Sequence, residues 1–84
     1  MEILKKTLME LEGERVDIHV RHTLFGEQNL KIKKFIPVTD AGVGFRCRNQ
    51  EVYIPYDQVK GYKIENNKTI INGHNRVISI LKNA

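Results

Sequence analysis

The hydrophobic period of this chain changes at Gly13, and this change constrains the fold more than any other feature of the sequence. Before it, Leu4, Leu8 and Leu11 recur at the spacing of one helical face. After it, in the segment VDIHV, apolar and polar residues alternate, as they do in a strand with one buried face. The sequence therefore predicts an amphipathic helix over residues 2–12 that ends at the glycine and is followed by β structure. A helix this short is marginal alone in water, so we expect its leucines to dock on the strands.

The rest of the chain, over residues 14–82, is predicted to form five or six short strands separated by turns. In VGFRCR, alternation predicts that Val43, Phe45 and Cys47 face the core. Gly44 between them indicates a bend or the close approach of another backbone. Two longer segments are each predicted to be one strand: LKIKKFIPV with a bulge at its lysine pair, and VYIPY continued by QVKGYKIE.

An open sheet of so few strands would leave its edges exposed, and closure into a barrel removes them. The predicted fold class is therefore mainly β. We expect an N-terminal α-helix followed by a five- to six-stranded, strongly bent antiparallel barrel. With 84 residues, the chain is expected to form this barrel as a single domain.

Composition limits the class of protein but does not identify a function. The formal net charge of +4 is compatible with nucleic-acid binding. Cys47 is the single cysteine, which excludes an intramolecular disulfide and predicts a reducing, cytoplasmic environment. No apolar run is long enough to span a membrane, and the first thirteen residues lack the pattern of a signal peptide.

The order of these parts resembles the Sm-like superfamily, which includes the bacterial Hfq proteins. A leucine-striped helix followed by LEGERVDIHV is similar to the opening of that family. EVYIPYDQVKGYKI resembles the fourth and fifth strands of Hfq, whereas IINGHNRVISI resembles the second Sm motif, and either segment could hold the equivalent strands. Asn72 stands where that motif has arginine. The resemblance implies a small barrel of the SH3-like (Sm-like) type that self-associates through neighbouring edge strands and binds RNA.

The sequence predicts no catalytic residue, no metal site and no cofactor. Asp17 and His19 share the polar face of a strand, but surface alternation explains the pair simply. His22 falls on the opposite face, so metal ligation by both histidines is not expected. Cys47 is predicted to be buried, with its flanking arginines pointing away. We therefore expect a protein that is not an enzyme.

Basic side chains are the first candidates for contacting RNA. Lys31 and Lys33 share the outward face of one predicted strand, and Arg46 and Arg48 share that of the next. If those strands pair, the four charges gather on one face and attract phosphates.

The loop NGHNR is the second candidate. Asn72-Gly73 between branched residues predicts a hairpin turn, because both residues can adopt positive φ. The polar side chains that follow could contact a nucleotide. The predicted nucleic-acid-binding residues are, in total, Lys31, Lys33, Arg46, Arg48, Asn72, Gly73, His74 and Arg76.

VYIPY is short, apolar and interrupted by proline, which favours an edge strand that pairs with another subunit. Its predicted interface residues are Val52, Tyr53, Ile54 and Tyr56, and a homo-oligomer is expected. The two tyrosines are also the aromatic pair expected to be exposed for stacking on bases. The alternative function is an SH3-like module that binds a protein and no nucleic acid.

Overall fold

The computed structural model describes residues 1–83, which form one α-helix, eight β-strands and a short 3-10 helix. The elements are α1 (Glu2–Glu10), β1 (Val16–His22), β2 (Gly26–Ile32), β3 (Ile36–Val38), β4 (Gly42–Cys47), β5 (Gln50–Pro55), η1 (Tyr56–Gln58), β6 (Gly61–Glu65), β7 (Lys68–Asn72) and β8 (Arg76–Lys82). The fold is mainly β with one N-terminal helix, as the change of period predicts.

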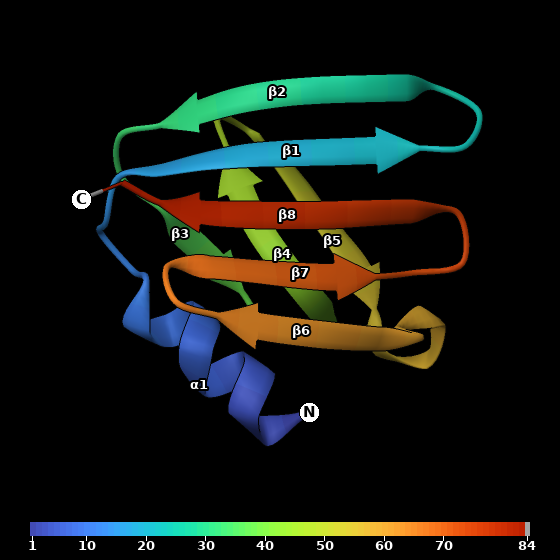
Figure 1. The fold of residues 1–84 in the computed structure, drawn as a ribbon, viewed down its shortest axis with the longest axis horizontal. Coiled ribbons are helices and arrows are strands. Elements are labelled where there is room, and N and C mark those ends of the chain that lie inside the picture. The colour runs from blue at the N-terminus through green and yellow to red at the C-terminus, as the bar shows by residue number, and fades with distance from the viewer. Residues whose placement is uncertain (84) are drawn as a thin grey trace.

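The strands form two antiparallel sheets that face each other (Figure 1). Sheet A has the order β2-β1-β8-β7-β6, and sheet B has the order β3-β4-β5. In Figure 1 the strands of sheet B run diagonally behind those of sheet A, and α1 lies beside β6. The core fills the space between the sheets. Its fully buried side chains are Leu4, Leu8, Val16, Ile18, Phe35, Val43, Phe45, Ile54, Ile71, Ile78 and Ile80.

The predicted docking of the helix is confirmed for its leucine face. Leu4 and Leu8 are fully buried and Leu11 is half-buried, whereas Ile3 is 66 % exposed. The helix ends at Glu10, two residues before the predicted end. Gly13 then adopts a left-handed φ of 81°, and its N–H donates a 2.9 Å hydrogen bond to the carbonyl of Phe35. The glycine therefore directs the chain from the helix into the sheets.

The expected number of strands was wrong, because each of the two longer predicted segments is two strands. LKIKKFIPV bends at Lys33 and Lys34 and passes from sheet A into sheet B, so the predicted bulge is a crossing between the sheets. VYIPY and GYKIE are likewise separated by η1 and lie in different sheets. Within residues 1–83 the strand pairing gives two sheets and no closed ladder. No helix in this part of the chain combines the length and the apolarity needed to cross a membrane.

Candidate functional site

Two hairpin loops lie together at one end of sheet A, where the chain turns from β1 to β2 and from β7 to β8 (Figure 1). The backbone N–H of Thr23 in the first loop donates a 2.9 Å hydrogen bond to the carbonyl of Asn75 in the second. We call residues 21–27 and 72–77 the hairpin end. The cross-loop hydrogen bond makes these two segments, about fifty residues apart in the sequence, one surface.

The first loop presents two apolar side chains to solvent. Leu24 is 80 % exposed and Phe25 is 84 % exposed. Both backbone N–H groups point to Nδ1 of His22, at 3.0 Å for Leu24 and 3.4 Å for Phe25, and the imidazole and phenyl centroids lie 4.6 Å apart. Gly26 ends the loop with a φ of 81°. Because the loop bonds internally to His22, its apolar side chains extend outward from an ordered turn.

The charge of the hairpin end is mostly positive. A cleft of about 520 Å³ opens between the loops. It is lined by Arg21, His22, Thr23, Gly26, Glu27, Gly73, His74, Asn75, Arg76 and Val77. Its one carboxylate, that of Glu27, lies 3.3 Å from Nε2 of His19 on the outer face of sheet A. Arg21 and Arg76 form no ion pair within residues 1–83, so both side chains can attract an anion.

The predicted hairpin at Asn72-Gly73 is confirmed, but its predicted conformation was wrong. Neither residue adopts positive φ. The N–H of Gly73 donates a 2.8 Å hydrogen bond to the carbonyl of Arg76, which closes the loop. A Cβ atom at Gly73 would lie 3.1 Å from the side chain of Ile54, so a larger residue here would require that side chain to shift. His74 and Asn75 remain exposed, as expected of residues that could contact a ligand.

The predicted cluster of four basic side chains does not form on one pair of strands, because only the end of the second predicted strand, β3, pairs with β4. Lys31 is in β2 of sheet A, and Arg46 is in β4 of sheet B. Arg46 also forms an ion pair with Glu51 on the neighbouring strand. Arg48 adopts a φ of 58° in the β4–β5 turn. Of the predicted nucleic-acid-binding residues, the hairpin end brings together only those of residues 72–76.

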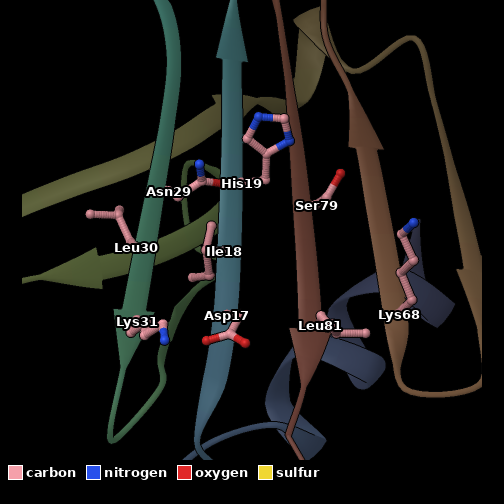
Figure 2. A pocket seen from close by; sticks show the side chains of 9 residues that line it. All are labelled: Asp17, Ile18, His19, Asn29, Leu30, Lys31, Lys68, Ser79 and Leu81. Carbon is pink, nitrogen blue, oxygen red and sulfur yellow. The ribbon is translucent and has the colours of Figure 1, made fainter.

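The outer face of sheet A holds a shallow hollow of about 420 Å³ (Figure 2). Asp17, His19, Asn29, Lys31 and Ser79 project into it from β1, β2 and β8. The imidazole of His19 pairs with Glu27 and not with Asp17, so the acid–base pair considered from the sequence is not formed. Within residues 1–83, no hydrogen bond joins the Ser79 hydroxyl to an imidazole or a carboxylate, and no group of three metal-ligating side chains is found.

The predicted interface segment VYIPY is an edge strand, as expected, because β5 ends the order of sheet B. Its side chains are less available than predicted. Ile54 is buried, while Tyr53 and Tyr56 are half-buried. The Tyr56 hydroxyl donates a hydrogen bond to the carbonyl of Thr39, and the ammonium group of Lys5 lies 4.7 Å from its ring centroid. The two tyrosines are therefore not the exposed aromatic pair that we expected.

Sequence reasoning missed Arg21, His22, Leu24 and Phe25 as site residues. The apolar pair directly before Gly26 was an available signal, since a turn that exposes leucine and phenylalanine has no structural need for them. Their nearness to residues 72–76 had no signal in the sequence, because it depends on β1 and β8 being neighbours. Comparison of the chain with protein-family models, with curated proteins and with solved structures finds no significant match.

Proposed function

We propose that this protein is a non-enzymatic, Sm-like small barrel that self-associates in the cytoplasm and binds single-stranded RNA at its hairpin end. The observation that carries the proposal is the exposed ring of Phe25 beside the cleft that contains Arg21 and Arg76. Single-stranded nucleic acids are bound by this combination, since bases stack on aromatic rings while basic side chains contact phosphates.

The barrel part of the proposal is supported by the connections between the sheets. Only residues 33–35 separate β2 from β3, and residues 56–60 separate β5 from β6. If each of these pairs is one bent strand, the chain has six strands. Each bent strand then has one partner for each half, in the closed order β1, β2–β3, β4, β5–β6, β7 and β8, although the outer edges of β2, β3, β5 and β6 stay unpaired. This is how a small barrel closes with few strands.

Removal of the two arginines is expected to weaken RNA binding and its dependence on salt. Each phosphate contact to single-stranded nucleic acid contributes about 0.7 to the slope of log K against log salt, so Arg21→Ala with Arg76→Ala should lower that slope by about 1.4. Fluorescence anisotropy of a labelled single-stranded RNA of mixed sequence, at several salt concentrations, measures both the affinity and the slope.

The matched control is Arg46→Ala with Arg48→Ala, which removes the same charge from sheet B. We expect its slope to stay that of the parent, because Arg46 is paired with Glu51 and neither arginine lines the cleft. An equal loss in both double variants would show that net charge, not the hairpin end, determines binding. A parent protein that binds no RNA at low salt would contradict the proposed function.

Phe25→Ala is expected to weaken binding without changing the salt dependence. Loss of one base–aromatic stack costs about 1–3 kcal/mol, which is roughly 5- to 150-fold in Kd. Leu24→Ala is the control, since it removes an equally exposed apolar side chain that has no ring. If both substitutions weaken binding equally, apolar contact alone holds the ligand and the stacking interpretation is wrong.

The second candidate is an SH3-like module that binds a protein. The observation in its favour is that β5 is an edge strand, with the half-buried Val52, Tyr53 and Tyr56 beside Ile54. A mostly apolar protein interface would depend weakly on salt, unlike phosphate contacts. The salt series therefore separates the two functions.

A further inference from the structure

Strand β2 has one unpaired edge, and it is the longest uncovered edge in the described structure. It is seven residues long, and its only strand partner is β1 (Figure 2). Gly26, Glu27, Gln28, Asn29 and Lys31 are exposed. The other three sheet edges are less suited to pairing: β6 lies beside α1, β3 has three residues including a proline, and β5 ends in a proline.

The free hydrogen-bonding groups of this edge can be identified from the ladder. The N–H of Thr23 donates to the carbonyl of Asn75, and the carbonyl of Arg15 accepts from the N–H of Asn83. Both groups therefore point from β1 toward the side of β8, away from β2. Because backbone groups point alternately to the two sides of a strand, the N–H and C=O groups of the even-numbered residues of β1 point toward β2. Their partners in the register are the even-numbered residues of β2. The N–H and C=O groups of Glu27, Asn29 and Lys31 are left pointing away from sheet A.

These three residues are arranged symmetrically, with Glu27 and Lys31 equally far from Asn29. Suppose that a second copy of β2 pairs antiparallel with the first and that Asn29 lies opposite its own counterpart. Glu27 of each copy then lies opposite Lys31 of the other, which is the favourable cross-strand arrangement of charge. The same register places Gly26 opposite Ile32, where the absence of a side chain leaves room. It also adds cover to the half-buried Leu30 and Ile32.

We propose that two copies of this chain associate through β2, centred on Asn29, and form one continuous ten-stranded sheet from two five-stranded sheets A. Edges of natural sheets are protected from pairing by charged side chains, a proline or a bulge, and like charges directly opposite each other oppose pairing. This edge has opposite charges placed to match their counterparts in a second copy. The inference rests on the self-association in the proposed function and specifies its surface, but it does not require RNA binding.

Disulfide cross-linking tests both the interface and its register. In a Cys47→Ala background, Asn29→Cys should form a covalent dimer under mild oxidation, because directly opposed Cα atoms in a hydrogen-bonded pair are about 5.5 Å apart. Glu27→Cys is the matched control on the same exposed face. Its counterpart would be four residues away along the strand, about 14 Å, so its cross-linking should be at least about tenfold slower. Lys31→Cys alone should behave in the same way.

A mixture of the Glu27→Cys and Lys31→Cys proteins should cross-link as fast as Asn29→Cys, since these positions face each other in the proposed register. Equal rates for all single variants, or no dimer of Asn29→Cys, would overturn the proposal. Light scattering of the parent should give a dimer that Asn29→Pro converts to monomer, because the proline removes a free-edge donor and no internal hydrogen bond. A parent that stays monomeric at millimolar concentration would also overturn it. Asn29 and Lys31 lie outside the hairpin end, so RNA binding by the Asn29→Cys and Lys31→Cys proteins is judged separately.

Discussion

Gly44→Ala is expected to lower the free energy of unfolding by about 3 kcal/mol or more, at the upper end of the cost of overpacking. Gly44 lies in the middle strand of sheet B, directly opposite Tyr53 of β5. A Cβ atom at this position would overlap the carbonyl oxygen of Val52 and lie 2.5 Å from the Cα atom of Tyr53. Backbone atoms cannot move aside as the end of a flexible side chain can, so β4 and β5 must separate.

Thermal unfolding followed by circular dichroism measures this effect. For a domain of this size, we expect the Tm to fall by about 12–24 °C. The matched control is Gly61→Ala, at the first residue of β6, where a Cβ atom would meet nothing within 4 Å. That substitution should be neutral, or stabilising by up to about 1 kcal/mol, because it restricts the unfolded chain. A Gly44→Ala protein as stable as Gly61→Ala would contradict the packing of β4 against β5.

Leu8→Ala is expected to cost about 2–4 kcal/mol, because its side chain is fully buried between the helix and the sheets. Leu4 beside it is buried as well, and the removal of Leu8 leaves a cavity that one short helix cannot close. The loss is large for a chain of 84 residues, whose core is small relative to its surface. Urea unfolding with a parallel heat scan measures it, and we expect a fall in Tm of about 8–32 °C.

Ile3→Ala is the matched control for the helix. Ile3 is in the same turn as Leu4 but is 66 % exposed, so its loss should change the Tm little. An unchanged Tm for Leu8→Ala would show that α1 is a loose arm and that the leucine stripe serves some other contact. Equal losses for both variants would show that helix formation, not docking, sets the stability.

Local patterns in the sequence were sufficient to predict most of the elements. The leucine spacing predicted α1, and alternation correctly assigned Val16, Ile18, Val43 and Phe45 to the core. These predictions hold because the side chain's direction in a helix or strand depends on its position along that element alone. The close approach at Gly44 was predictable for a related reason. A glycine inside a strand weakens the strand because it has no side chain to pack, so its presence often indicates that another backbone lies close by.

Partner choice among strands was decided by tertiary structure. Alternation correctly predicted that the side chains of Lys31 and Arg46 point to solvent. It could not predict which sheet each residue belongs to, because that depends on which strands pair. The crossing at Lys33 and Lys34 puts the two side chains in different sheets. No local pattern distinguishes that crossing from a bulge, because both interrupt the alternation in the same way.

By itself, the sequence determined one docked helix, a mainly β fold and a hairpin at residues 72–76. Only the tertiary structure joined that hairpin to the loop of Leu24 and Phe25, through the hydrogen bond from Thr23 to Asn75. It also left the edge of β2 open. The physical reason is that the hydrophobic period of a segment indicates only which face of that one helix or strand is buried. The meeting of segments about fifty residues apart depends instead on the free energy of packing two sheets around one shared core.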